Sequence, residues 1–262
     1  MSNDSSESKR PKVTHANVRN GLYVLGVILY TLFVYLAAQL VAGVVVLSIY
    51  VWTGGNVASA ETWLKESVSA QFFYILLAEL VTVAGVLWFQ RRRKQGLTQL
   101  GLNKMQLKYL GIALLGFGVY FLLYAVAATL ASSFIPQFNL EQKQDIGFTS
   151  VVSNTDLLLT AISLVVLPPI AEEILFRGFL FTGIRKKLSF WPAAMLTSIA
   201  FGAGHLQFGN DAPLLWAAAL DTFVLSMVLS YIREKTGSLW PGILIHAGKN
   251  MLAFSALFLF TR

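Results

Sequence analysis

The chain has 262 residues, of which 56% are hydrophobic and 13% are charged, with a formal net charge of +7 and no cysteine. Soluble domains carry roughly 25% charged residues, so this composition excludes an ordinary soluble protein and favours a membrane protein. The absence of cysteine excludes disulfides, thiolate nucleophiles and thiolate metal ligands.

The amino-terminal segment is polar, whereas the run that follows it is not. Residues 1–20 are rich in Ser, Asn, Lys and Arg, and we interpret them as a disordered cytoplasmic tail. No charged side chain occurs from Gly21 to Ala60. The apolar part of this run is longer than a signal-peptide core, which has about 7–15 residues. We therefore expect a retained membrane anchor.

Seven apolar runs approach the roughly 20 residues that a helix needs to cross the hydrocarbon core. They are Leu22–Trp52, Phe72–Phe89, Leu110–Ile135, Leu157–Ile184, Trp191–His205, Leu214–Ile232 and Leu239–Phe260. Unpaired backbone groups are not tolerated in lipid, so these runs are expected to be helices. The sequence thus predicts an all-α, polytopic bundle of about seven or eight transmembrane helices around a buried polar cavity. We interpret residues 21–262 as a single transmembrane domain.

The eighth span depends on the fourth run, which contains Pro168-Pro169. Proline lacks a backbone donor and clashes with the preceding turn, so we expect a kink or a break there. A new helix beginning near Ile170 would place Glu172 and Glu173 in its first turn, where the helix dipole favours carboxylates.

The distribution of positive charge indicates how the chain is oriented in the membrane. With a cytoplasmic amino terminus, most Lys and Arg residues fall on the inner side, and only Lys65, Lys143 and Arg262 fall outside. This asymmetry is the positive-inside bias, and it predicts an integral protein of the plasma membrane with its amino terminus in the cytoplasm. We expect the basic loops to contact anionic lipid and expect no nucleic-acid partner.

Three short motifs place ionisable and amide groups within the carboxyl-terminal spans, in residues 156–260. They are Glu172-Glu173-x-x-x-Arg177, Phe201-x-x-x-His205 and His246-x-x-x-Asn250. Charged groups inside a bilayer are rare and usually mark a function. The alternative interpretation is that they are polar contacts which hold helices together.

The spacing within each motif assigns candidate roles. Glu173 and Arg177 are four residues apart and share a helical face, so they can pair, while Glu172 points about 100° away toward a possible cavity. His246 and Asn250 also share a face and could donate hydrogen bonds to a developing oxyanion. Measured along their helices, Glu172, His205 and His246 lie at similar depths of roughly 20, 21 and 16 Å. The sequence therefore predicts that they converge on one buried site.

Three further ionisable residues lie in the spans. Asp221 and Lys249 flank the loop near Thr236 almost symmetrically, so we predict an ion pair between antiparallel neighbours. Its desolvation makes it doubtful as a source of stability, but it could fix helix register. Glu79 has no obvious partner in the sequence.

The three motifs, in this order and each within a membrane helix, resemble the CPBP family. That family comprises the type II CAAX prenyl proteases and the bacteriocin-processing and abortive-infection proteins, and the resemblance covers about residues 156–260. One departure is Lys249, a cation beside Asn250 where an apolar or small residue would be usual.

The resemblance implies a membrane-embedded, glutamate-dependent endopeptidase without a metal cofactor. It implies that Glu172 and His205 position and deprotonate water, that His246 and Asn250 stabilise the oxyanion, and that Glu173 and Arg177 support Glu172. The substrate would be a peptide or protein that reaches the membrane, prenylated or not.

Other functions stay open at this stage. Glu172, His205 and His246 could instead bind zinc with water in the fourth position, although no His-Glu-x-x-His helix is present. The chain could also be a non-catalytic immunity or scaffold protein whose polar residues join helices. A transporter with a protonatable pathway is disfavoured, because no repeat is visible.

Overall fold

The computed structural model describes residues 15–135, 138–142, 144, 146–207 and 214–260, and within these ranges the chain is helical and has no β-strand. The helices in chain order are α1 (His15–Trp52), η1 (Val57–Ser59), α2 (Ala60–Glu66), α3 (Val68–Arg92), α4 (Leu97–Leu100), α5 (Lys108–Phe134), α6 (Asn154–Ala161), η2 (Ile162–Val166), α7 (Leu167–Glu172), η3 (Glu173–Phe181), α8 (Thr182–Arg185), α9 (Phe190–Ala203), α10 (Trp216–Thr236) and α11 (Trp240–Phe258).

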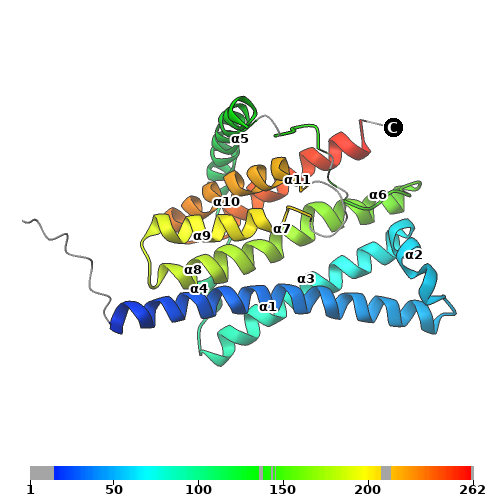
Figure 1. Cartoon of the computed structure of the whole chain (residues 1–262), viewed down its shortest axis with the longest axis horizontal. Coiled ribbons are helices and arrows are strands. Elements are labelled where there is room, and N and C mark those ends of the chain that lie inside the picture. Colours follow the sequence, from blue (N-terminus) through cyan, green and yellow to red (C-terminus); the bar gives the residue numbers. More distant parts are fainter. Residues whose placement is uncertain (1–14, 136–137, 143, 145, 208–213, 261–262) are drawn as a thin grey trace, which may run out of the picture.

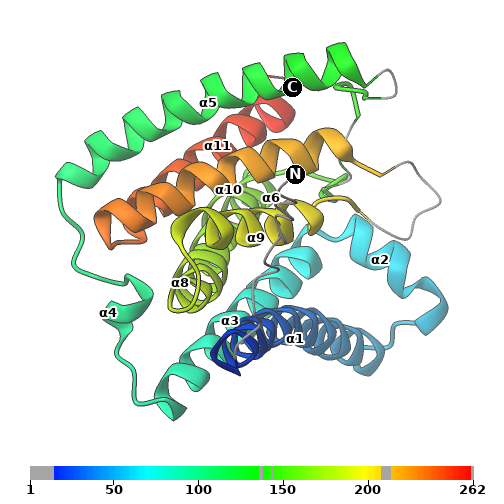
Figure 2. The ribbon, with the colours of Figure 1, turned by 60° about the vertical axis from the view of Figure 1, so that its left-hand side comes forward.

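The segments α6 to α8 follow one another without interruption and form one long central helix of 32 residues, Asn154–Arg185. This helix lies between two groups, α1 with α3 on one side and α9, α10, α11 and α5 on the other (Figures 1 and 2). One apolar core joins α1, α3 and the central helix, and a second joins α5, α10 and α11. The central helix is therefore placed to present side chains to both groups.

The outer surfaces of α1 and α5 are apolar. Large side chains such as Leu22, Phe33, Leu114 and Leu115 are more than 60% exposed. Soluble proteins rarely leave such large apolar surfaces open to water, whereas lipid covers them without cost. Five helices are long and apolar enough to cross a membrane: α1, α3, α5, the central helix and α10. The chain is thus an integral membrane protein.

All seven predicted spans are present as helices, and apart from the start of the first their bounds differ from the prediction by four residues or fewer. Two of them, α9 and α11, are shorter or less apolar than the five helices named above. α9 has 14 residues, which extend about 21 Å, less than the hydrocarbon core of about 30 Å. α11 carries the polar residues of the third motif, which lower its hydropathy, and it is not among the five. The predicted number of seven or eight spans is therefore not confirmed.

The predicted boundary of the amino-terminal tail is wrong in part. α1 begins at His15, so residues 15–20 belong to the helix and not to a disordered segment. These residues extend α1 beyond its apolar section. The remainder of the predicted tail, residues 1–14, lies outside the described residues.

The expected break at Pro168-Pro169 is also absent. Just before the prolines the helix takes a π-helical turn, η2, in which the Leu167 N–H donates to the carbonyl of Ile162. The prolines follow directly at the start of α7, so the wider turn before them accommodates two residues that lack an N–H. Because the helix runs on, Glu172 and Glu173 lie in its middle and not in a first turn. The helix dipole therefore does not account for them.

Candidate active site

The central helix carries the first motif at the junction of α7 and η3. Glu173 and Arg177 form the predicted ion pair, with Oε1 and Nη1 2.7 Å apart. Both side chains are buried, with exposed fractions of 1% and 0%. The Arg177 guanidinium also lies over the ring of Phe201, 4.5 Å from its centroid, which is a cation–π contact. One carboxylate of the motif is therefore neutralised and held in place.

Glu172 points away from this pair, as its position in the helix predicts. Its side chain lines a cavity of about 650 Å³ between α1, the central helix and α9. Tyr35, Phe176 and His205 line the same cavity, and most of the remaining wall is apolar. The Glu172 Oε2 atom is buried and has no hydrogen-bond partner among the described residues. This carboxylate is thus the one that a molecule in the cavity can reach.

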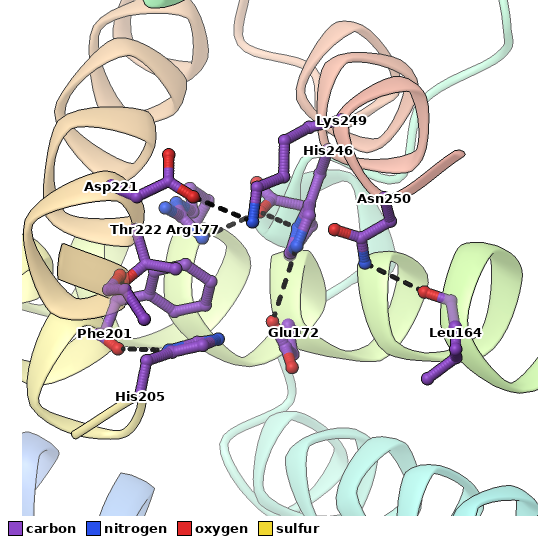
Figure 3. Close-up of polar contacts among 12 residues, drawn as sticks. Leu164, Glu172, Arg177, Phe201, His205, Asp221, Thr222, His246, Lys249 and Asn250 are labelled. Atoms are coloured by element: carbon purple, nitrogen blue, oxygen red, sulfur yellow. Dashed lines mark hydrogen bonds and ion pairs between the residues drawn. The ribbon is translucent and has the colours of Figure 1, made fainter. Parts of the chain in front are cut away.

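His246 lies between the two carboxylates. Its Nε2 atom is 3.7 Å from Glu172 Oε2, and its Nδ1 atom is 3.4 Å from Glu173 Oε1 (Figure 3). The imidazole is 4% exposed and packs edge-on against Phe201, with ring centroids 5.8 Å apart. A protonated His246 would face negative charge on both sides of its ring.

His205 follows the end of α9, and its orientation is set by its own helix. The His205 Nδ1 atom lies 2.9 Å from the carbonyl oxygen of Phe201 (Figure 3). Since a carbonyl can only accept, this contact assigns the proton to Nδ1 and leaves Nε2 of the neutral ring as an acceptor. His205 is not in direct contact with Glu172, but both side chains line the same cavity.

Asn250 is engaged with the central helix. Its Nδ2 atom donates to the carbonyl oxygen of Leu164, 2.8 Å away, within the π-helical turn η2 (Figure 3). Asn250 and His246 share a face of α11, as predicted, yet Asn250 is not among the residues that line the cavity. The structure therefore shows a contact that joins α11 to the central helix at this residue.

Lys249 forms the predicted ion pair with Asp221, with Nζ and Oδ2 3.0 Å apart. The hydroxyl of Tyr120 donates to the other oxygen of Asp221, a contact that the sequence did not indicate. These residues come from α11, α10 and α5, so the pair fixes three helices beside the site. The cation that departs from the family pattern is thus accounted for.

Two residues near Glu172 were missed or left open by sequence reasoning. Glu79 on α3 is partly buried and lies within electrostatic range of Glu172 and of Tyr74. Tyr35 lies in the middle of the first apolar run and lines the same cavity as Glu172. A polar hydroxyl halfway along a membrane helix, away from the interfaces where Tyr is usual, was the available signal.

The alternative zinc site is not assembled in this arrangement. Within the described residues, no three His, Asp or Glu side chains are grouped as the ligands of one ion would be. His205 directs Nδ1 to a backbone carbonyl, and Glu172 and His246 supply one close pair. The side chains present therefore do not fit a three-ligand centre.

The part of the chain that matches a known family contains this site. Residues 154–252 match the family model described as type II CAAX prenyl endopeptidase Rce1-like, and they contain all three motifs. No solved structure matches the chain.

Two curated relatives are similar to parts of the chain. An uncharacterized 24.3 kDa protein of Escherichia coli is 34% identical over 93 residues, which are 35% of this chain and 41% of that protein. The UPF0177 protein YxdF of Lactococcus lactis subsp. lactis (strain IL1403) is 24% identical over 147 residues, which are 53% of this chain and 77% of that protein. The chain thus spans about two fifths of the first relative.

Proposed function

We propose that this chain is an intramembrane endopeptidase whose general base is Glu172, because residues 154–252 match the family model of Rce1-like type II CAAX prenyl endopeptidases. Its substrates would be peptides or proteins that reach the membrane, prenylated or not. We further propose that it resides in the plasma membrane with its amino terminus in the cytoplasm.

One observation carries the proposal: the chain has two adjacent carboxylates with different environments. Arg177 holds Glu173, whereas Glu172 lines the cavity with a buried oxygen that has no hydrogen-bond partner among the described residues. A purely structural role would favour pairing both. A carboxylate that faces a cavity beside an imidazole acceptor is suited to general-base work on water.

In the proposed reaction, water is held between Glu172 and Nε2 of His205. Glu172 takes one proton from the water, and the water oxygen attacks the carbonyl carbon of the scissile peptide bond. The resulting oxyanion is stabilised by His246 in its protonated form and by Asn250. The carbon–nitrogen bond then breaks, and Glu172 returns the proton to the leaving amine.

Glu173 and Arg177 support this step without taking part in it. Arg177 anchors Glu173, and Glu173 in turn lies 3.4 Å from His246 Nδ1. We propose that this chain of contacts orients the imidazole so that Nε2 faces Glu172.

The experiment uses purified full-length protein in liposomes with a library of membrane-anchored peptides in ¹⁸O water. Hydrolysis places one labelled oxygen in each new carboxyl group, which mass spectrometry detects. The variant Glu172→Gln keeps the size of the side chain and removes the base, so labelled fragments are expected to fall about 10²–10⁴-fold. The matched control is Glu61→Gln, the same substitution at an exposed glutamate of α2.

Undiminished labelled fragments from Glu172→Gln would exclude Glu172 as the base. Fragments that disappear under a strong chelator and return with zinc would favour the zinc alternative. If the wild type hydrolyses no peptide and Glu172→Gln keeps the biological effect, the chain would instead be a non-catalytic immunity or scaffold protein.

A further inference from the structure

A second pocket lies at the basic end of the bundle, away from the candidate active site. It has a volume of about 290 Å³ and lies where α1 begins, α3 ends and the central helix ends. None of its lining residues lines the active-site cavity. These helix ends are on the left in Figure 1. For a membrane-spanning chain this position is the water–lipid interface.

The pocket is positively charged. Arg93, Lys186 and Lys187 line it, and none of the described lining residues is acidic. Within the described part of the chain, none of the three cations forms an ion pair with a carboxylate. The neighbouring Arg185 differs, because it pairs with Glu234 at 2.7 Å. Three cations thus surround one recess, and no anion from the described part of the chain balances them.

A buried amide adds an independent observation. Gln90 lines the pocket, its side chain is only 6% exposed, and its Oε1 atom has no hydrogen-bond partner among the described residues. Buried polar atoms are nearly always satisfied, so an unpaired one at a pocket wall indicates a ligand or solvent group there. As an acceptor, Oε1 requires a donor such as a hydroxyl.

The walls of the pocket place the charges at a lipid surface. Tyr23 and Phe89 contribute apolar faces, and the cations Lys187 and Arg93 lie over these rings at 5.5 and 5.3 Å. Basic pockets between transmembrane helices on the cytoplasmic side suit anionic head groups. Since water in the liquid occupies about 30 Å³, the volume has room for a phosphate and the hydroxyl-bearing group attached to it.

We propose that this pocket binds a phosphate group, with the three cations facing the phosphoryl oxygens and Gln90 Oε1 accepting a hydrogen bond from a ligand hydroxyl. The phosphate comes either from an anionic phospholipid or from free phosphate, because phosphatidylglycerol and hydrogen phosphate both present oxygens and a hydroxyl. A bound phosphate would join α1, α3 and the end of the central helix.

The test measures ligand binding to the full-length protein in detergent by native mass spectrometry and thermal shift. The probes are short-chain phosphatidylglycerol, short-chain phosphatidylcholine and inorganic phosphate. The pocket variant is Lys186→Gln with Lys187→Gln. The control variant is Lys104→Gln with Lys108→Gln, which removes two charges from the same end of the bundle outside the pocket.

The wild type is expected to bind phosphatidylglycerol and not phosphatidylcholine. Each pocket lysine is expected to contribute about fivefold to the affinity, so the pocket variant should bind about 25-fold more weakly and the control nearly as the wild type. Competition by inorganic phosphate would identify free phosphate as sufficient, and no competition would identify the lipid. Equal losses in both variants would overturn the proposal, since they would show only diffuse attraction.

A measurement on the wild type alone keeps the test decisive if the pocket variant fails to fold. Phosphatidylglycerol in the pocket should slow amide hydrogen exchange in residues 93–99 relative to phosphatidylcholine. Equal exchange with the two lipids would refute the proposed site.

Discussion

The buried pair of Glu173 and Arg177 allows a test of how burial changes the contribution of an ion pair to stability. Glu173→Gln keeps the size of the side chain and removes its charge, which leaves the Arg177 guanidinium in the interior without its carboxylate. Glu61 and Lys65 on α2 form the same i,i+4 pair at the same 2.7 Å distance, but their side chains are 81% and 63% exposed. Glu61→Gln is therefore the control, the same substitution in an exposed pair of the same spacing.

The expected loss of stability in Glu173→Gln follows from the contacts of Arg177. Its Nη1 atom binds Glu173, whereas Nε and Nη2 have no hydrogen-bond partner among the described residues. Removing one partner of a buried pair costs about 3–5 kcal/mol, because the remaining charge is uncompensated. At about 2–4 °C per kcal/mol for chains of this size, Glu173→Gln should lower the Tm by about 6–20 °C. Glu61→Gln should leave the Tm unchanged.

The assay is thermal unfolding of the purified variants in one detergent, followed by tryptophan fluorescence. The double variant Glu173→Gln with Arg177→Met removes both charges and should recover part of the loss, since no charge stays buried. A Tm for Glu173→Gln equal to that of Glu61→Gln would refute the reasoning. A double variant less stable than Glu173→Gln would show that the contact of Arg177 with Phe201, and not charge pairing, dominates.

Three further outcomes are expected. Asp221→Asn should lower stability by about 1.5–3 kcal/mol, because it removes the charge that Lys249 contacts at 3.0 Å; an unchanged Tm would mean that the pair does not stabilise the bundle. Asn250→Ala should cost about 1–3 kcal/mol, because a carbonyl of the central helix loses its donor, and it should also lower turnover, because the amide is proposed to donate to the oxyanion. Unchanged turnover would remove Asn250 from the proposed reaction. Gly202→Ala should destabilise by about 1–3 kcal/mol, since the added Cβ would lie 2.9 Å from a carbonyl oxygen of α10. Gly26→Ala is the control, because a Cβ there meets open space. Equal effects of the two substitutions would contradict the packing argument.

The helices were predictable because the bilayer imposes a simple rule of length and apolarity. Long apolar runs located both ends of α3 and α5 to within four residues, and the end of α1. The same rule does not decide whether α9 and α11 span the bilayer, because a short or polar helix can be covered by its neighbours instead of by lipid. Which helices meet lipid depends on packing, and a single sequence does not specify packing.

The π-helical turns were not predictable. Ordinary helical propensity and spacing assume α geometry, so Pro168-Pro169 was interpreted as a break when the chain accommodates it with η2. The i,i+4 pairing of Glu173 with Arg177 was predicted correctly because it is local. The position of His246 between two carboxylates is a contact between helices distant in sequence, and only the fold reveals it.

The π-helical turn η2 has a consequence for how this chain can change its length. Such turns behave as single-residue insertions in an α-helix. Deleting one residue from Ile162–Val166 should therefore restore regular α geometry without unfolding the helix. The wider turn takes up its extra residue locally, so the helix faces on both sides of the deletion should keep nearly the same orientation relative to the carboxylates. A related chain that is one residue shorter here can then be aligned with its gap in Ile162–Val166, which keeps Glu172 and Glu173 on their present faces.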